Sequence, residues 1–510
     1  MFVIYGPPGT GKTTTLLDMV EKSIEKGTPP GQIAFLAFTR KAAREAKERA
    51  ASRFNLDTEH DLYFFRTLHS FCYNLSDIKR DQLLASEHLV ELGNTIGFNL
   101  RASSGSEEDD IGAAARDNPI MQLIQLSRLK KEVIDETYRH SGIEEPLTTV
   151  KYIDDCYRKY KRANRLYDYT DILEWFSQNG SRVCPRFDVT FLDEAQDLSP
   201  LQWEIAHVLN EKSRRMYAAG DDDQAIYRWA GADVEHFLNV EEGSEVLSQS
   251  YRVPRTVHKV AQRIANRITI RRPKHYNPKP EDGTVHHIFE PDIEKFKKGD
   301  WMIMAQCNYM LNEVCESLKQ HGFYFENRGY RSISLKLAIA LDTWKSLVKG
   351  EEVTANAVKD LYYFMKSITR IKRGFKNLPN TQADDMFTLA SLQENMGLLA
   401  TKDMTWDVAM DKISEDNKTY IAALLRRGED LNRAPRIKVS TIHGTKGGEA
   451  TNVVLYTDIS NASDQSISSD TREGRRMLDD LHRLFYVGVT RSKQNLFIVS
   501  PMDGIRSYQI

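Results

Sequence analysis

Cysteine is scarce in this chain of 510 residues, and the cysteines that are present do not cluster. None of them belongs to a C-x-x-C pair. This spacing argues against a zinc site, an iron–sulfur cluster and a disulfide framework. The positions are Cys72, Cys156, Cys184, Cys307 and Cys315. We therefore expect a protein of a reducing compartment.

Long apolar runs and an excess of one charge are also missing. No hydrophobic stretch approaches the about 18 residues that a membrane helix needs, and the first residues predict a strand rather than a signal peptide. The formal net charge is -2. Binding of a polyanion must therefore depend on a local basic surface, not on the field of the whole protein. The length predicts three or four domains.

The chain begins with a pattern that binds phosphate. A strand is predicted at residues 2–5 and a helix at 14–26, and GPPGTGKT lies between them. This fits G-x-x-x-x-G-K-[ST] in the strand–loop–helix context that the motif requires. Glycines let backbone N–H groups wrap a phosphate, and the helix N-terminus adds positive potential. The predicted nucleotide-binding residues are Gly6, Pro7, Pro8, Gly9, Thr10, Gly11, Lys12, Thr13 and Thr14.

An acidic pair completes this chemistry. Lys12 should reach the β- and γ-phosphates of the nucleotide, and the Thr13 hydroxyl should hold Mg²⁺. A strand predicted at 187–192 ends in Asp193 and Glu194. Asp193 can hold the magnesium through water, and Glu194 can take a proton from the attacking water. The sequence thus predicts a nucleotide and Mg²⁺ as ligands and hydrolysis as the reaction.

Polar and aromatic side chains follow the next predicted strand, at 216–220. Gln224 could sense the γ-phosphate, and Tyr227 and Trp229 carry rings that suit stacking on nucleic-acid bases. A place in the hydrophobic core is the alternative for the aromatic residues.

Two earlier strands are predicted, one at 32–38 and one within 64–71 that runs into a polar turn. Phe38 ends the first of them, at the edge where ligands of open α/β sheets bind, and Arg40 beside it suits a phosphate backbone. His69 lies in the second, where a lone histidine is more often structural.

Taken in order, these patterns resemble superfamily 1 helicases of the UvrD/Rep/PcrA type. The motifs are GPPGTGKT, AFTRKAA, RTLHSF, FLDEAQDLSPLQ, AAGDDDQAIYRWAGAD, LSQSYRVP, VSTIHGTKGGEA and FYVGVTRSKQNLFIV. They span almost the whole chain. The other superfamily 1 branch carries a GDPKQL-like motif where this chain has GDDDQAIYRW.

The resemblance implies an α/β fold with two RecA-like parallel-sheet domains in tandem. Each would carry a helical insertion, and ATP would bind in the cleft between the two domains. The predicted boundaries are 1–75 and 166–244 for the first RecA-like domain, 76–165 for its insertion, 245–334 and 435–510 for the second, and 335–434 for a shortened second insertion.

The resemblance also implies residue roles. Arg252 and Arg491 would reach the γ-phosphate from the second domain as arginine fingers. Tyr251 would pack near the base and Glu449 near the sugar. The residues implied to contact DNA are Phe38, Arg40, Thr67, His69, Tyr227, Trp229 and His443.

The chain departs from the family pattern at several positions. Thr14 and Ala230 stand where arginine is common, and Gly448 and Ala450 alter the usual Lys-Gly-Leu-Glu-Phe run. The family's glutamine motif before the phosphate loop is not found, so we expect a relaxed choice among nucleotide bases. None of these departures touches the residues predicted to hydrolyse ATP.

The implied function is an ATP-dependent DNA helicase that moves 3′ to 5′ on single-stranded DNA and unwinds duplexes. A single-strand translocase that displaces proteins with little unwinding is one alternative, and an ATP-dependent nucleic-acid switch is another. The expected partners are single-stranded DNA and single/double-strand junctions, with no membrane. The expected location is the cytoplasm, in association with DNA.

Overall fold

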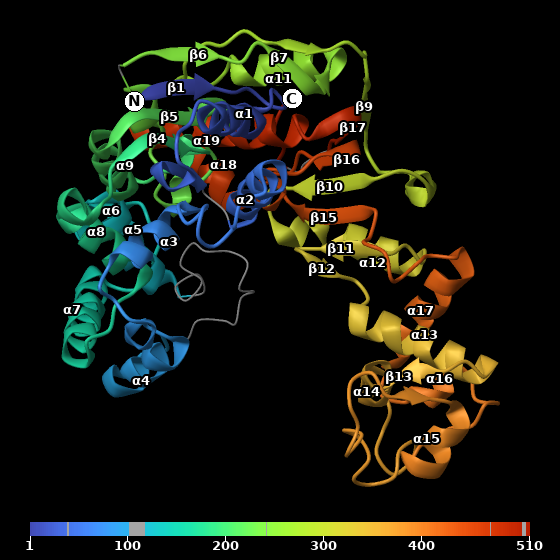
Figure 1. The fold of residues 1–510 in the computed structure, drawn as a ribbon. Coiled ribbons are helices and arrows are strands. Elements are labelled where there is room, and N and C mark those ends of the chain that lie inside the picture. Colours follow the sequence, from blue (N-terminus) through green and yellow to red (C-terminus); the bar gives the residue numbers. More distant parts are fainter. Residues whose placement is uncertain (38–39, 101–117, 241, 470, 502–505) are drawn as a thin grey trace. The chain divides into compact units, whose positions relative to one another are not determined.

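The computed structural model describes the whole chain except residues 38–39, 101–117, 241, 470 and 502–505. The chain divides into two compact units (Figure 1). The first unit comprises Met1–Glu281 and Asp470–Thr490, and the second comprises Asp282–Ser469 and Arg491–Ile510. Each unit is built on its own sheet.

The first unit contains a six-stranded parallel sheet with the order β3-β2-β4-β5-β1-β6. Its strands are β1 (Phe2–Tyr5), β2 (Ile33–Ala37), β3 (Phe65–Thr67), β4 (Phe187–Leu192), β5 (Ser213–Gly220) and β6 (Ser244–Val246). Every residue of β2 is buried, as expected for a strand covered on both faces. Because β5 separates β1 from β4, the phosphate loop and the acidic pair follow strands about 10 Å apart at one edge of the sheet.

Helices cover both faces of this sheet. They are α1 (Lys12–Glu25) and α2 (Arg40–Phe54) on one face, and α3 (Leu68–Leu75), α8 (Tyr169–Val183) and α9 (Pro200–Lys212) on the other. The other helices of this unit are α4 (Ser86–Ile96), α5 (Pro119–Lys130), α6 (Ile134–Arg139), α7 (Leu147–Asn164), α10 (Val234–Leu238), α11 (Arg255–Ala265) and α19 (Arg472–Val489). Ile4 belongs to the apolar cluster with α1 and α2. Val3 and Tyr5 belong to the cluster with α3, α8 and α9. This alternation along β1 gives the sheet two buried faces.

One predicted strand is shorter than expected. The strand predicted within 64–71 ends at Thr67, and α3 begins at Leu68. The Thr67 side chain accepts a hydrogen bond from the Ser70 backbone N–H at 3.2 Å. This is an N-terminal helix cap, and it turns the second half of the RTLHSF motif into a helix.

The segment between α3 and α8 has an apolar core of its own. Leu89 of α4, Ile124 of α5 and Ile153 of α7 all belong to it. The segment lies within the predicted insertion 76–165, and the division of the chain into four parts stays a prediction.

The second unit is built on a seven-stranded sheet with the order β12-β11-β15-β10-β16-β17-β9. Its strands are β9 (Thr284–Ile288), β10 (Trp301–Ala305), β11 (Phe325–Asn327), β12 (Tyr330–Arg331), β15 (Ile437–Thr441), β16 (Ala450–Tyr456) and β17 (Ser492–Val499). All neighbours are parallel except β11 and β12. The predicted α/β fold class with parallel sheets in tandem is therefore confirmed.

The other elements of the second unit are mainly helical. They are α12 (Asn312–Gln320), α13 (Leu335–Lys349), β13 (Val353–Thr354), α14 (Ala355–Tyr363), β14 (Met386–Phe387), α15 (Leu389–Asn395), α16 (Trp406–Ala409), α17 (Glu415–Arg427) and α18 (Asn461–Ile467). Among the residues that the structure describes, no helix is long and apolar enough to cross a membrane.

Candidate active site

Two glycines shape the loop between β1 and α1. Gly9 and Gly11 have φ values of 71° and 79°, in the left-handed region that favours glycine. A Cβ on Gly9 would lie 2.3 Å from the Cβ of Arg252, which belongs to strand β7 (Gln249–Pro254). The loop and β7 therefore approach too closely for any side chain at position 9. Because α1 begins at Lys12, its first N–H groups open onto the loop, an arrangement that binds phosphate.

The Lys12 side chain extends back over the start of this loop. Its Nζ donates a hydrogen bond to the Gly6 carbonyl at 3.0 Å and lies 3.8 Å from Glu194 Oε1. A Cβ on Gly6 would lie 1.8 Å from Lys12 Cγ, so any larger residue at position 6 would displace the lysine. The ammonium group is thus held between the loop and the carboxylate that is predicted to act as the base.

Asp193 and Thr13 fit a magnesium ion. The Thr13 hydroxyl donates to Asp193 Oδ2 at 2.7 Å. Asp193 is only 2% exposed; burial, and after it the charge of Glu194, raise the pKa of this carboxyl to about 6. The pair offers the hard oxygen ligands that Mg²⁺ prefers, and the charge of Lys12 only partly offsets the burial of the carboxylate. Thr13 and Asp193 would hold the ion, which supplies charge neutralisation for phosphate oxygens.

Glu194 adopts an unusual backbone conformation. Its φ is 55° and its ψ is 39°, a left-handed geometry that costs a non-glycine residue of order 1 kcal/mol. It caps a short 3₁₀-helix, Ala195–Asp197, and its Oε2 accepts a hydrogen bond from Gln196 Nε2 at 2.6 Å. The Glu194 side chain is 30% exposed. A carboxylate that remains in contact with solvent can accept a proton from water, whereas buried Asp193 is better placed as a ligand.

Gln224 follows three consecutive buried aspartates after β5. Its Nε2 donates to Asp221 Oδ2 at 2.7 Å. Lys274 Nζ lies 3.1 Å from Asp221 and 3.0 Å from Asp223, and it also pairs with Asp222. Burial alone would lower the pKa of Lys274, but the three carboxylates raise it. A buried ammonium ion therefore anchors the segment that positions Gln224.

Strand β7 joins the phosphate loop through hydrogen bonds. The Ser250 hydroxyl donates to the Pro8 carbonyl at 2.7 Å, and the Tyr251 N–H donates to the Gly9 carbonyl at 2.8 Å. The Tyr251 side chain is 75% exposed, which leaves its ring open to stacking. The predicted boundary at residue 245 assigns Arg252 to a second domain. The structure groups the chain up to Glu281 with the phosphate loop.

Sequence reasoning missed three residues of this region. Gln196 and Ser250 lie inside quoted motifs, FLDEAQDLSPLQ and LSQSYRVP, where each could have been found as a polar residue next to a predicted functional one. Lys274 carried no such signal, because nothing nearby in the sequence indicates its three partners.

A family model described as the UvrD/REP helicase N-terminal domain matches residues 1–245. The matched residues include the phosphate loop, the acidic pair and Gln224. Residues 1–245 are therefore similar to this helicase domain. The predicted resemblance to the UvrD/Rep/PcrA family is confirmed.

Curated relatives extend the similarity beyond this domain. The chain is 23% identical, over 98% of its length, to a probable DNA helicase II homolog of Mycoplasma genitalium, covering 83% of that protein. It is also 23% identical, over 98% of its length, to the putative ATP-dependent DNA helicase YjcD of Bacillus subtilis, covering 77% of that protein. Identity to the ATP-dependent DNA helicase PcrA of Staphylococcus aureus is 24%, over 58% of this chain and 42% of PcrA.

One solved structure with a similar chain is Arterivirus nonstructural protein 10 (helicase). The match has a TM-score of 0.34 and 12% identity, and it covers 99% of this chain and 60% of that one. This chain thus spans about 60% of the length of that helicase. A TM-score this low carries no weight for fold or function.

Of the two aromatic residues after Gln224, Trp229 is exposed and Tyr227 is half-buried. Trp229 is 48% exposed, and its ring centroid lies 6.2 Å from that of Tyr227, edge to face. Between them, Arg228 donates to Glu473 at 2.6 Å and to Asp480 at 2.5 Å on α19. The exposure of Trp229 argues against the alternative of a core residue.

The other DNA-contact candidates within residues 1–245 differ in exposure. Arg40 is exposed at the start of α2, Thr67 is buried as the cap of α3, and His69 is half-buried with its ring centroid 6.4 Å from that of Tyr169. Phe38 lies outside the described residues. Contact with DNA stays a prediction for all of them.

Three predicted residues belong to the second unit. Arg491 is buried, and its Nη1 donates to the Gly448 carbonyl at 3.1 Å. Glu449 is exposed, with its carboxylate 3.5 Å from Lys493 Nζ. His443 begins the 3₁₀-helix His443–Thr445. Their roles toward nucleotide and DNA stay predictions.

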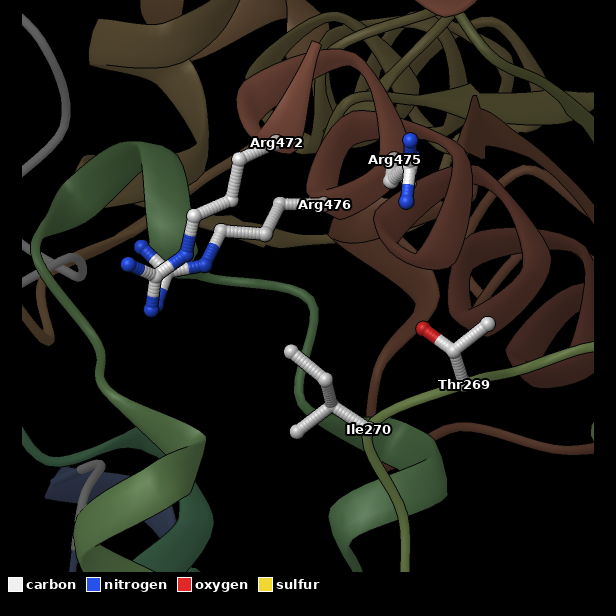
Figure 2. Close-up of a pocket in the computed structure, with 5 residues that line it drawn as sticks. All are labelled: Thr269, Ile270, Arg472, Arg475 and Arg476. Atoms are coloured by element: carbon white, nitrogen blue, oxygen red, sulfur yellow. The ribbon is translucent and has the colours of Figure 1, made fainter. Parts of the chain in front are cut away.

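Two cavities of the first unit lie away from the phosphate loop. One, of about 250 Å³, is lined by Thr269, Ile270, Arg472, Arg475 and Arg476. Figure 2 shows the Arg472 and Arg476 guanidinium groups side by side, with Arg475 apart from them. The other, of about 230 Å³, is lined by residues of α10, α19 and the segment after Gln224. Neither is lined by the phosphate loop or the acidic pair, so neither is the nucleotide site.

Proposed function

We propose that the protein is an ATP-dependent DNA helicase, which hydrolyses ATP to move along single-stranded DNA and unwind duplexes. The observation that carries the proposal is the hydrogen bond between Thr13 and Asp193. It joins the phosphate loop after β1 to the acidic pair after β4. The names of the relatives that are similar over almost the whole chain support DNA as the partner.

The chemistry of the site follows from the positions of its charges. A water oxygen attacks the γ-phosphorus and forms a new P–O bond, while the bond from that phosphorus to the β–γ bridging oxygen breaks. Glu194 accepts the water's proton, and ADP carries away the electrons of the broken bond. Lys12, 3.8 Å from Glu194, offsets negative charge on the phosphates. Gln224 would respond to the presence of the γ-phosphate.

The proposed DNA contacts rest on the exposed ring of Trp229 and the half-buried ring of Tyr227 after Gln224. Trp229 and Tyr227 would stack on successive bases, and each such stack is worth about 1–3 kcal/mol. The Gln224–Trp229 segment resembles the branch that moves 3′ to 5′, so this direction belongs to the proposal. Single-stranded DNA and single/double-strand junctions would be the substrates.

A strand-displacement assay tests the proposal. We expect ATP-dependent unwinding of duplexes with a 3′ single-stranded tail and none of duplexes with a 5′ tail. Reversed preference would overturn the polarity. Displacement of a protein block from single-stranded DNA without unwinding would favour the translocase. DNA binding that depends on ATP but brings neither movement nor unwinding would favour a switch.

A further inference from the structure

Gln196 follows the acidic pair and is completely buried, with 0% of its surface exposed. Its Nε2 donates to Glu194 Oε2 at 2.6 Å and to Asp197 Oδ2 at 3.1 Å. Its Oε1 accepts the backbone N–H of Asp221 at 3.0 Å. Carboxylates only accept and a backbone N–H only donates, so these partners fix the orientation of the amide. Gln196 therefore links two carboxylates after β4 to the end of β5.

The link continues from Asp221 to Gln224. Asp221 accepts the Gln224 side-chain amide at 2.7 Å and lies 3.1 Å from Lys274 Nζ. A single chain of contacts thus runs from Glu194 through Gln196 and Asp221 to Gln224. The predicted base and the predicted γ-phosphate sensor are tied together within one unit, across the adjacent strands β4 and β5.

Gly220 makes room for this amide. A Cβ on Gly220 would lie 2.4 Å from Gln196 Oε1 and 2.7 Å from Phe237 Cζ. Gly220 does not adopt a positive φ, so its backbone conformation does not require glycine. Position 220 therefore lacks a side chain because the Gln196 amide and the Phe237 ring occupy the space that one would need.

Glu194 is the group that needs such support. It has a left-handed backbone conformation and a flexible side chain, and misplacing a reacting group by about 1 Å can lower a rate by about 10²-fold. We propose that Gln196 is a positioning residue that aligns the Glu194 carboxylate for hydrolysis and couples its position to that of Gln224. This inference rests on the proposed function, because Glu194 needs alignment only if it acts on water.

The first test is the variant Gln196→Met in the full chain, which keeps the length of the side chain and removes its hydrogen bonds. We expect kcat of DNA-stimulated ATP hydrolysis to fall about 10–100-fold. KM for ATP should stay within about threefold, because the hydrogen bonds of Gln196 go to Glu194, Asp197 and Asp221 and not to Lys12 or the phosphate loop. A kcat within about threefold of wild type would overturn the inference.

Gln202→Met is the matched control. Gln202 is a buried glutamine of the same motif, but its Oε1 accepts the Ser199 N–H at 2.9 Å in the cap of α9. Loss of this hydrogen bond should lower the thermal midpoint and leave kcat per folded molecule unchanged. A kcat loss as large in Gln202→Met as in Gln196→Met would mean that packing near the site, not alignment of Glu194, sets the rate, and would overturn the inference.

A double-mutant cycle distinguishes the loss of Glu194 alignment from general damage to the fold. In a Glu194→Gln background, Gln196→Met should change the single-turnover rate by less than about threefold, since no base remains to be aligned. If the rate reductions of Glu194→Gln and Gln196→Met multiply in the double variant, the inference is overturned. A wild-type protein without ATPase activity, or a Glu194→Gln variant with the full rate, would instead reject the proposed function and the inference together.

Gly220→Ala keeps the inference testable if Gln196→Met does not fold. The added methyl group should displace the amide and lower kcat with little change in KM. Gly31→Ala is its control, because a Cβ there meets nothing within 4 Å. Equal kcat values for Gly220→Ala and Gly31→Ala would overturn the inference.

Discussion

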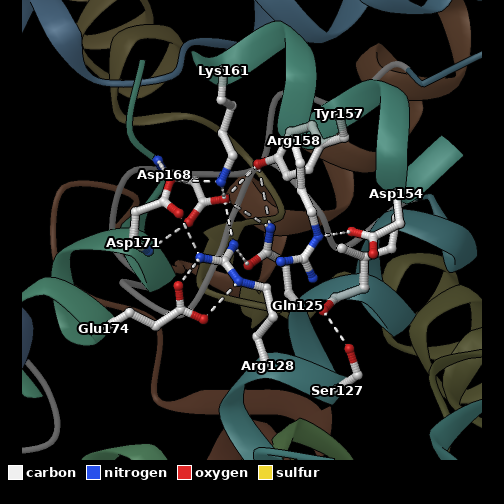
Figure 3. Close-up of polar contacts among 11 residues, drawn as sticks. Gln125, Ser127, Arg128, Asp154, Tyr157, Arg158, Lys161, Asp168, Asp171 and Glu174 are labelled. Carbon is white, nitrogen blue, oxygen red and sulfur yellow. Dashed lines mark hydrogen bonds and ion pairs between the residues drawn. The ribbon is translucent and has the colours of Figure 1, made fainter. Parts of the chain in front are cut away.

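Two clusters of buried charge in the first unit differ in how their carboxylates are compensated. In one, helices α5, α7 and α8 bring two cations to Asp168 (Figure 3). Arg128 Nη1 and Lys161 Nζ donate to Asp168 Oδ2 at 2.7 and 2.5 Å. In the other, Lys12 Nζ lies 3.8 Å from Glu194 Oε1, and Asp193 is bonded by the Thr13 hydroxyl. Two cations therefore bond directly to Asp168, the most buried carboxylate of the first cluster, whereas no cation among the described residues bonds directly to Asp193 in the second.

The pKa values follow this difference. Burial would raise the pKa of Asp168, but Arg128 and Lys161 hold it below its usual value. For Asp193, burial and the charge of Glu194 raise the pKa to about 6. Carboxylates that are paired with cations of the protein help to hold the folded chain together. Buried carboxylates with too few cations around them can instead bind a positively charged ligand. The comparison teaches that burial alone does not identify a functional carboxylate.

The largest expected effect is on catalysis, in the undercompensated cluster. Glu194→Gln should lower ATP hydrolysis about 10²–10⁴-fold, because it removes the base and keeps the shape of the side chain. Nucleotide affinity should change little. Single-turnover hydrolysis and equilibrium nucleotide binding measure the two quantities, with Glu211→Gln on the exposed surface of α9 as the control. Hydrolysis near the wild-type rate would remove Glu194 from its role.

The next effect is on stability, in the compensated cluster. Arg128→Met should lower the free energy of unfolding by about 3–5 kcal/mol, because it removes one of the two cations that compensate the buried carboxylates. Urea unfolding measures this loss. The matched control is Arg158→Met on neighbouring α7. Arg158 pairs with Asp154 at 2.8 Å, and its side chain is 46% exposed, against 6% for Arg128. The control should cost less than about 1 kcal/mol; equal losses would undo the comparison.

A smaller effect concerns DNA binding rather than charge. Trp229→Ala should weaken affinity for single-stranded DNA by about 1–3 kcal/mol, the worth of one base stack, with little change in ATPase activity without DNA. Trp203→Ala is the contrasting variant, since Trp203 is only 1% exposed and its loss should lower the thermal midpoint. Binding curves and thermal melts distinguish the two. Early melting of Trp229→Ala would place that ring in the core.

The smallest effect is a dependence on pH. The pKa of Asp168 is lower in the folded chain than in the unfolded chain. Its contribution to stability is therefore complete above the unfolded pKa of about 3.9 and is lost as the pH falls below it. The stability gap between wild type and Arg128→Met should narrow below pH about 4, by up to about 1.4 kcal/mol per pH unit. Urea unfolding between pH about 3 and 7 measures the gap, and a constant gap would contradict the assignment.

Much of the fold could be predicted because it depends on neighbours in the sequence. The strand predicted at 187–192 is observed as β4 with the same bounds. The phosphate loop could be predicted for the same reason, since one strand, one turn and one helix contain all its parts. The strand predicted within 64–71 failed after Thr67, where a side-chain cap overrides the β propensity of the residues that follow.

The sequence by itself determined the resemblance to the UvrD/Rep/PcrA family, the two parallel-sheet units and the residues of the phosphate loop and acidic pair. Only the tertiary structure decided that Lys274 pairs with three aspartates, that Gln196 links Glu194 to Asp221, and that β7 packs on the phosphate loop. Sequence patterns repeat over a few residues and so report local secondary structure. Burial and the pairing of charges depend instead on groups that folding brings together from distant positions in the chain. The compensation of a carboxylate is therefore a property of the folded chain.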